Sequence, residues 1–110
     1  MNPETVILRD IRDHLESRGF KVKRTHGGAF IKGFADLYTA RDGVARWVEV
    51  KVPKKYAFTN AQLDMFSDLE EAGIGTWVMT CVADYPKLFG PANWRDFLKP
   101  RDIRYLESKE

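Results

Sequence analysis

The sequence lacks the features that mark several special classes of protein. It has a single cysteine, Cys81, so no disulfide can form within the chain, and a reducing, cytoplasmic compartment is the simplest expectation. The N-terminus is polar, so we expect no signal peptide, and no apolar run approaches the roughly 20 residues that span a bilayer. Internal repeats, low-complexity tracts and linkers are also absent. We therefore expect a single domain that does not enter a membrane.

The sequence does contain enough apolar material for a core. Hydrophobic residues make up 44% of the 110 residues, and seven Phe and three Trp add bulk, which suits one compact domain. Cys81 lies in the apolar run from Thr76 to Ala83. Apolar surroundings disfavour a thiolate, so this position predicts a buried structural thiol rather than a nucleophile.

The net charge of +2 hides an uneven distribution of charge along the chain. Residues 1–17 carry a net −2, residues 18–55 a net +7 and residues 56–110 a net −3. A basic middle segment suits a polyanionic partner such as a nucleic acid, but a solvated basic surface explains it equally well. Charge alone leaves both interpretations open.

Hydrophobic periodicity and turn residues predict six main elements in the order α-β-β-β-α-β. Helices are expected at 3–18 and 59–72, and strands at 20–25, 35–40, 45–52 and 76–82. Asn2 suits the N-cap of the first helix, and Thr59 and Gln62 have the spacing of a capping box at the second. The link between residues 52 and 76 is long enough for a parallel crossover, so we predict an α/β (α+β) fold with a mixed sheet flanked by helices. Beyond residue 84 we expect a short helix at 93–98 and an edge strand or helical turn at 103–106.

The strand predicted at 45–52 carries Glu49 and Lys51 two residues apart, so their side chains point the same way. A hairpin turn at Asp42-Gly43 pairs position i with about 85 − i, which places Asp36 opposite Glu49. Two carboxylates from adjacent strands can share one hard cation such as Mg²⁺ or Mn²⁺, and the backbone carbonyl of Val50 is a further oxygen ligand. This set predicts a metal site beside an amine.

Phosphodiester hydrolysis needs such a set. A divalent ion neutralises developing charge, and Lys51 would orient or deprotonate the attacking water or stabilise the transition state. Glu49 and Lys51 alone are more typical of a surface salt bridge than of a catalytic site. Asp36, however, lies in an otherwise apolar run, where a lone carboxylate needs a partner or a metal. Glu4 shares the inward face of the first helix. It could interact with the helix N-terminus or belong to a metal or substrate site.

These residues resemble a known family. Gly33-Phe34-Ala35-Asp36, then Trp47-Val48-Glu49-Val50-Lys51, then Thr59-x-x-Gln62 and Gly73-Ile74-Gly75 are similar to the PD-(D/E)XK nuclease superfamily, and within it to the VRR-NUC (virus-type replication-repair nuclease) branch. The resemblance covers residues 4–80 and implies a restriction-endonuclease-like core, with 84–110 as a C-terminal extension of one domain. The sequence departs from the pattern where Ala35 replaces the expected Pro before the Asp.

The resemblance implies roles residue by residue. Asp36, Glu49 and Lys51 match the catalytic core, Glu4 matches an acidic residue that contributes to the metal site, and Gln62 matches a glutamine that supports the site. For Gln62 the capping-box interpretation holds as well. The activity implied is that of a Mg²⁺- or Mn²⁺-dependent DNA endonuclease selective for branched or four-way (Holliday) junctions, acting as a homodimer without a small-molecule cofactor. A lone compact nuclease domain is in turn suggestive of a phage or bacterial host cell.

Basic residues flank this proposed site in sequence and are expected to contact DNA phosphates: Lys21, Lys23, Arg24, Lys32, Lys54 and Lys55. Aromatic residues of the tail, such as Tyr85, Phe89 and Trp94, could form a dimer face or complete the core. The alternative functions are a non-catalytic nucleic-acid-binding module on the same fold, and a structural or protein-interaction domain.

Overall fold

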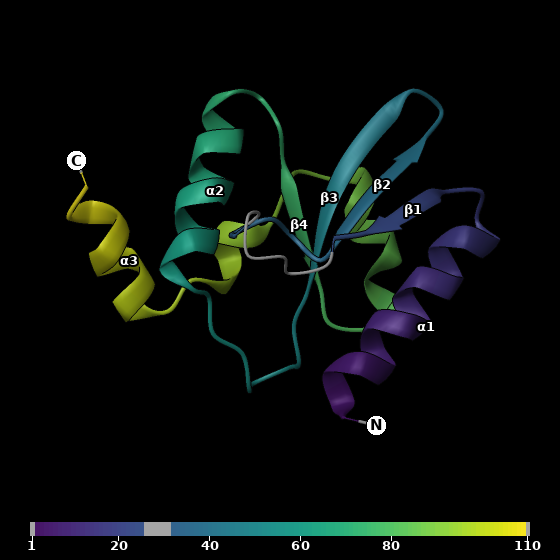
Figure 1. The fold of residues 1–110 in the computed structure, drawn as a ribbon, viewed down its shortest axis with the longest axis horizontal. Helices are drawn as coiled ribbons and strands as arrows, with labels where there is room; N and C mark the ends of the chain where they lie inside the picture. The colour runs from purple at the N-terminus through teal and green to yellow at the C-terminus, as the bar shows by residue number, and fades with distance from the viewer. Residues whose placement is uncertain (1, 26–31, 110) are drawn as a thin grey trace.

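The computed structural model describes residues 2–25 and 32–109, and in this part of the chain one four-stranded sheet has helices on both faces (Figure 1). The strands are β1 (Lys21–Arg24), β2 (Leu37–Arg41), β3 (Val44–Val50) and β4 (Thr76–Met79). The α-helices are α1 (Pro3–Ser17), α2 (Asn60–Glu71) and α3 (Pro100–Glu107), and two 3₁₀ helices, η1 (Val82–Phe89) and η2 (Trp94–Phe97), lie between β4 and α3. The predicted mixed α+β architecture and the order of its first six elements are confirmed.

The sheet has the strand order β1-β2-β3-β4, with β3 antiparallel to β2 and parallel to β4. Leu37 pairs with Val48 and Tyr38 with Trp47, which is the predicted hairpin register. The turn is formed by Asp42 (φ 53°) and Gly43 (φ 79°). Positive φ at both central positions is typical of a type I′ turn, whose twist matches that of the strands it joins.

Helix α1 covers one face of the sheet. Asn2 caps it by accepting a hydrogen bond from the Thr5 amide at 2.8 Å, and Pro3 occupies its first turn. Its buried stripe of Leu8, Ile11 and Leu15 packs with residues of β2, β3, β4 and η1 into one hydrophobic core. Because both strands of the hairpin are anchored in this core, the groups at their ends are held on a rigid frame.

Helix α2 covers the opposite face. Thr59 accepts a hydrogen bond from the Gln62 amide at 3.0 Å, and the Gln62 side chain accepts one from the Thr59 amide at 3.1 Å, so the predicted capping box is present. Leu63 and Phe66 of this helix form a second core with Val78 and Trp94. In Figure 1, α2 and α3 lie to the left of the sheet and α1 to its right.

The segment after β4 differs from the sequence-based expectation. The strand ends at Met79 rather than near residue 82, because the chain turns into η1, and Cys81 at that turn is exposed, so the expected burial of its thiol is wrong. The region of residues 103–106 lies within α3. Of the tail aromatics, Trp94 is buried in the α2-side core, Tyr85 is half-buried and Phe89 is exposed.

Across residues 2–25 and 32–109, no helix combines the length and apolar character needed to cross a membrane.

Candidate active site

The two predicted carboxylates meet at the end of the hairpin opposite its turn. Asp36 immediately precedes β2, and Glu49 lies near the end of β3. The Val50 amide donates to Asp36 Oδ2 at 2.8 Å, and the Asp36 amide donates to Glu49 Oε1 at 3.1 Å. Each carboxylate is therefore fixed by the backbone of the other strand. Adjacent strands of one hairpin hold the pair in register, as the sequence predicts.

Lys51 and Gln62 complete the cluster around Glu49. Lys51 Nζ lies 3.0 Å from Glu49 Oε2, and both side chains are almost buried, with exposures of 11% and 3%. Gln62 Nε2 donates to the same Glu49 oxygen at 2.8 Å, while its Oε1 lies 3.5 Å from Lys51 Nζ. Gln62 thus caps α2 and contacts the site at the same time, so both interpretations of this residue hold.

Burial disfavours the ionised form of both carboxyl groups. Loss of hydration raises the pKa of Glu49 to about 7, and the neighbouring charge of Asp36 adds to the effect, although Lys51 and Gln62 act in the opposite direction. Loss of hydration also raises the pKa of Asp36 above its ordinary value, with a further contribution from the charge of Glu4. The hydrogen bond from Val50 opposes this rise. Two acids held together in this way would be relieved by a cation between them.

Glu4 occupies a different place from the pair. It is exposed in the first turn of α1, within electrostatic range of Asp36 because its charge affects the pKa of that residue. In the described ranges, no three His, Cys, Asp or Glu side chains are grouped closely enough to hold one metal ion. The structure therefore brings Asp36 and Glu49 together but does not add Glu4 to them. Its role as a ligand stays a prediction.

The oxygen donors present fit a hard divalent ion. Mg²⁺ is commonly bound through one or two carboxylates, with waters and substrate phosphates completing its shell. Asp36 and Glu49 supply two such carboxylates, and backbone carbonyls such as that of Val50 are acceptable additional ligands.

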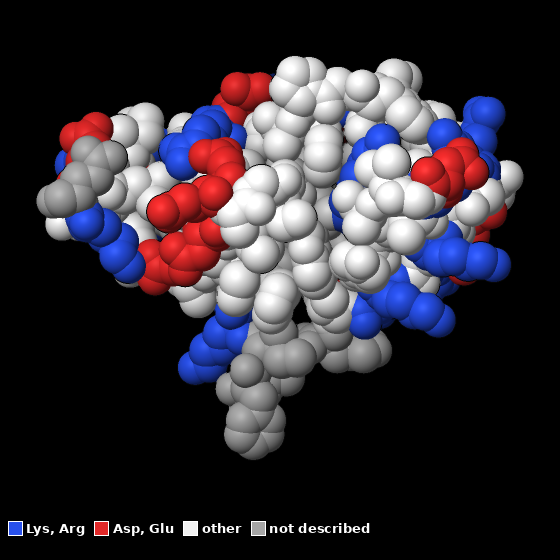
Figure 2. Space-filling model, turned by 90° about the horizontal axis from the view of Figure 1, so that it is seen from above, with Lys and Arg blue, Asp and Glu red and all other residues white. Residues whose placement is uncertain are grey.

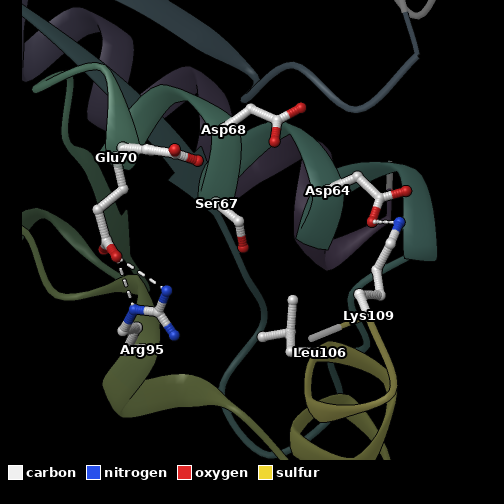
Figure 3. Close-up of a pocket in the computed structure, with 8 residues that line it drawn as sticks. Asp64, Ser67, Asp68, Glu70, Arg95, Leu106 and Lys109 are labelled. Atoms are coloured by element: carbon white, nitrogen blue, oxygen red, sulfur yellow. Dashed lines mark hydrogen bonds and ion pairs between the residues drawn. The ribbon is translucent and has the colours of Figure 1, made fainter.

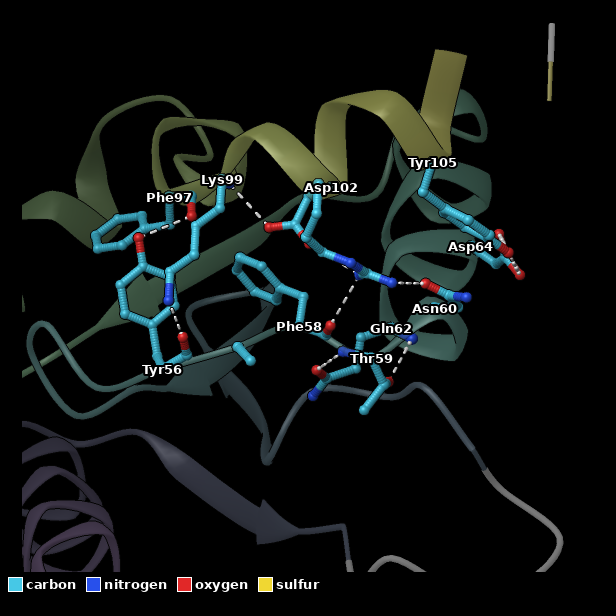
Figure 4. Close-up of polar contacts among 12 residues, drawn as sticks. Tyr56, Phe58, Thr59, Asn60, Gln62, Asp64, Phe97, Lys99, Asp102 and Tyr105 are labelled. Atoms are coloured by element: carbon cyan, nitrogen blue, oxygen red, sulfur yellow. Dashed lines mark hydrogen bonds and ion pairs between the residues drawn. The ribbon is translucent and has the colours of Figure 1, made fainter. Parts of the chain in front are cut away.

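The segment between β3 and α2 holds Lys51 in place. Lys51 Nζ donates to the carbonyl of Ala57 at 2.9 Å and lies 4.8 Å from the centre of the Phe58 ring. The C-terminal segment in turn holds these residues (Figure 4): Tyr56 donates to the Phe97 carbonyl at 2.8 Å, and Arg101 donates to the Phe58 carbonyl at 3.3 Å.

Further contacts strengthen this attachment. Arg101 donates to Asn60 Oδ1 at 2.5 Å and pairs with the buried carboxylate of Asp102 at 3.0 Å, and Lys99 Nζ donates to the Tyr56 carbonyl (Figure 4). We name the set Lys99, Arg101 and Asp102 the α3 brace. Sequence reasoning missed it, because nothing in a single sequence shows which distant backbone groups a charged side chain will reach.

Gly33 determines how closely the chain before Asp36 approaches α2. Its φ is +93°, and a Cβ placed there would lie 2.3 Å from the carbonyl oxygen of Ala61. Any side chain would therefore collide with the first turn of α2. The glycine found three residues before the Asp in the sequence thus has a structural reason, which is close packing of two backbones beside the site.

The six predicted phosphate-contacting residues are all exposed, and none forms an ion pair with a carboxylate of the described chain: Lys21, Lys23, Arg24, Lys32, Lys54 and Lys55. Seen from above, basic groups predominate on the side of the molecule where β1 and α1 lie, and acidic groups gather on the side of α2 (Figure 2). Cations without partners are available to a polyanion.

A separate groove of about 640 Å³ lies between α2 and α3 (Figure 3). It is lined mainly by carboxylates, including Asp64, Asp68, Glu70 and Glu71, and two of these already have basic partners: Arg95 pairs with Glu70 at 2.8 Å and Lys109 with Asp64 at 2.7 Å. Its excess negative charge would repel a nucleic acid. The groove is therefore poorly suited to a nucleic acid.

Comparison with known proteins agrees with this geometry at the level of the fold. No family model matches the chain, and no curated protein matches it. Among solved structures, the chain is similar to a VRR_NUC domain, with a TM-score of 0.69 and 21% sequence identity over 81% of this chain and 96% of that one. The chain therefore has the fold of a VRR_NUC domain, as the resemblance in its sequence predicts.

Proposed function

We propose that the chain is a metal-dependent endonuclease that hydrolyses phosphodiester bonds in DNA, using Mg²⁺ or Mn²⁺. The observation that carries this proposal is the cluster at the end of the hairpin, where Asp36, Glu49 and Lys51 converge and Lys51 Nζ lies 3.0 Å from Glu49. The fold of a VRR_NUC domain and the exposed basic residues support it.

Each residue of the cluster has a defined task in this proposal. Asp36 and Glu49 would hold the metal ion, because their burial and mutual repulsion favour a cation between them. A bound divalent ion polarises a phosphoryl oxygen and lowers the pKa of water. Lys51 places a positive charge where negative charge develops on the phosphorus-bound oxygens, in a site that is largely shielded from solvent. Gln62 orients both Glu49 and Lys51.

The exposed cations supply a surface for the sugar-phosphate backbone. Phosphate contacts position a duplex without reading its sequence, which suits an enzyme that selects DNA by shape. We therefore propose branched or four-way junction DNA as the preferred substrate. Two-fold pairing of the chain into a homodimer would present two sites for two strands of a junction.

The test is cleavage of a labelled four-way junction and of linear duplex, with Mg²⁺ or Mn²⁺, by the wild type and Asp36→Ala. Asp68→Ala is a matched control, because Asp68 is an exposed carboxylate on α2. Cutting that is lost only in Asp36→Ala is expected. Binding without cutting under both metals would instead favour a non-catalytic binding module, and absence of binding would favour a protein-interaction domain.

The proposed homodimer has its own measurement. Size-exclusion chromatography with light scattering at micromolar concentration is expected to give twice the mass of the 12.7 kDa chain. A monomer under these conditions would contradict paired cutting while leaving the chemistry of the single site untouched.

A further inference from the structure

Three aromatic rings lie together on the sheet beside the carboxylate pair. Phe34 stacks on Trp47 with ring centres 5.0 Å apart and an angle of 29° between the planes, and Tyr38 lies on Trp47 at 4.9 Å and 57°. Phe34 and Trp47 are half-buried, whereas Tyr38 is 39% exposed. Only Phe34 and Trp47 are stacked, and Tyr38 is the tilted and most exposed member of this cluster of three rings.

Strand register places Tyr38 and Trp47 on the same face as the carboxylates. Tyr38 pairs with Trp47, two residues along each strand from Asp36 and Glu49. Side chains alternate along a strand, so residues two apart share a face and lie about 7 Å from one another. The intervening pair, Leu37 and Val48, points to the opposite face and packs in the α1-side core. The rings therefore form the next row of side chains after the carboxylate pair.

A cation lies next to Tyr38, the most exposed ring of the cluster. Lys23 of β1 pairs with Tyr38, while its neighbour Val22 packs against the α1-side core, so Lys23 lies on the face of the rings. Lys23 is exposed and forms no ion pair with residues of the described chain. A flat exposed ring beside a free ammonium group matches the two parts of a nucleotide, its base and its phosphate.

Core packing accounts for Trp47, which contacts the α2-side core, but not for Tyr38. Tyr38 keeps a large ring partly in solvent, and within residues 2–25 and 32–109 its hydroxyl makes no hydrogen bond. A base inside a duplex has both faces covered by its neighbours, so away from the duplex ends only an unpaired base can lie on such a ring.

We propose that Tyr38 stacks on an unpaired base adjacent to the scissile phosphodiester, with Lys23 contacting a phosphate of the same strand. This inference rests on the proposed nuclease function and makes Tyr38 a specificity-determining residue. It predicts a preference for DNA in which base pairing is interrupted beside the cut, rather than for continuous duplex.

The test measures binding separately from cutting. The chain carrying Asp36→Asn, which is expected to lose nearly all cleavage, is titrated into a duplex with a short unpaired tail containing 2-aminopurine, and into the same duplex without a tail. Stacking is expected to change the fluorescence of the tail. Tyr38→Ala is expected to remove this change and to weaken binding of tailed DNA about tenfold, with less than a twofold effect on blunt duplex.

Three further variants make the result specific. Tyr38→Phe is expected to restore stacking, and Tyr38→Leu, which keeps apolar bulk against Trp47, is expected not to. Val44→Ala removes a similarly exposed apolar side chain at the other end of the hairpin. This variant is expected to bind both DNAs as tightly as the parent protein does. The proposal would be overturned if Tyr38→Ala weakened binding of both DNAs equally. It would also be overturned if Tyr38→Ala or Tyr38→Leu did not weaken binding of tailed DNA.

The outcome also separates this inference from the proposed chemistry. If the wild type cuts tailed and blunt DNA equally and substitutions of Tyr38 have no effect, the nuclease function is supported and the stacking site is contradicted. Protein that never cuts yet binds tailed DNA through Tyr38 would support the stacking site and overturn the proposed hydrolysis.

Discussion

The two sides of the carboxylate pair are held very differently. On the side of α2, Lys51 and Gln62 bond to Glu49 and to each other, and the segment that carries Ala57 is tied to α3. On the side of β1, the side chains of Lys23 and Tyr38 extend into solvent and make no hydrogen bond or ion pair with the described chain. We name these the tied side and the open side.

This contrast indicates a division of tasks. Catalytic groups need a fixed geometry, which is supplied by neighbouring residues that restrict their movement. A surface that receives a polyanion needs cations free of internal partners. Substitutions on the tied side are therefore expected to change turnover and stability, whereas substitutions on the open side are expected to change affinity and substrate preference.

The largest effect is expected at the pair itself, where the two sides meet. Asp36→Asn removes a metal-binding charge, so cleavage is expected to fall by about 10³-fold or more, because a metal ion supplies several kcal/mol of transition-state stabilisation. The fold is expected to survive, since the change also removes a charge that raises the pKa of Glu49. Cleavage assays and thermal melts of Asp36→Asn and Asp68→Asn check both points. Loss of the fold would mean that Asp36 is structural.

The next effect separates turnover from binding. Lys51→Ala removes the buried ammonium beside Glu49 and is expected to lower kcat by about 10²- to 10³-fold, with little change in affinity for DNA. Lys87→Ala, a half-exposed lysine outside the cluster, serves as the control. If Lys51→Ala weakened DNA binding as much as cleavage, this lysine would behave like a residue of the open side, and the contrast would fail.

The α3 brace is expected to act on the site from a distance. Arg101→Ala removes the contacts to Phe58 and Asn60 and leaves the buried carboxylate of Asp102 without its ion-pair partner. We expect about a tenfold loss of kcat through displacement of Lys51, with unchanged KM and a lower melting temperature. Arg104→Ala on the same helix is the matched control, because Arg104 is exposed. A drop in melting temperature with full kcat would show that the brace only stabilises the fold.

Sequence reasoning succeeded where short-range rules apply. The positive φ values of Asp42 and Gly43, the alternation of side chains in β3 and the capping box at Thr59 are local, so they set the hairpin register and placed Asp36 beside Glu49. The lysines of the open side could also be predicted from the sequence, because they lie close to the motif along the chain.

The parts that sequence reasoning missed depend on contacts between distant segments. Arg101 reaches the carbonyl of Phe58, 43 residues earlier, and the turn into η1 exposes Cys81 although its sequence neighbours are apolar. Neither feature produces a periodic or short-spaced pattern in the sequence. The exposed ring of Tyr38 was likewise missed, because a tyrosine in an apolar strand looks like a core residue until strand pairing shows which side of the sheet is uncovered.

A smaller effect concerns stability against pH on the tied side. The pKa of Glu49 is raised from 4.5 to about 7 in the folded chain, so the folded state holds its proton more tightly than the unfolded state does. Without metal, the contribution of Glu49 to the free energy of unfolding is therefore expected to be largest below about pH 4.5. It should fall as the pH rises to about 7, by at most about 1.4 kcal/mol per pH unit for this proton.

Denaturant titrations in chelator across this range would measure the slope. Glu49→Gln is expected to flatten it, whereas Glu16→Gln, at an exposed position of α1, is expected to leave it unchanged. Added Mg²⁺ or Mn²⁺ is expected to stabilise the protein more at pH 7.5 than at pH 5, because metal and proton compete for the same carboxylate. A slope that Glu49→Gln does not alter would assign the pH dependence to other groups.

The smallest effect is expected from single exposed lysines, and it shows how DNA crosses the site. Each phosphate contact contributes about 0.9 to the slope of log affinity against log salt, which corresponds to roughly a 3.5-fold change between 50 and 200 mM. Lys21→Ala, on β1, and Lys55→Ala, after β3, are each expected to lower the slope by about this amount, whereas Lys109→Ala, whose amine already pairs with Asp64, is not. A reduced slope for Lys21→Ala alone would show that DNA contacts only the open side. Reduced slopes for both lysines would mean that the backbone passes over the carboxylate pair from one side to the other.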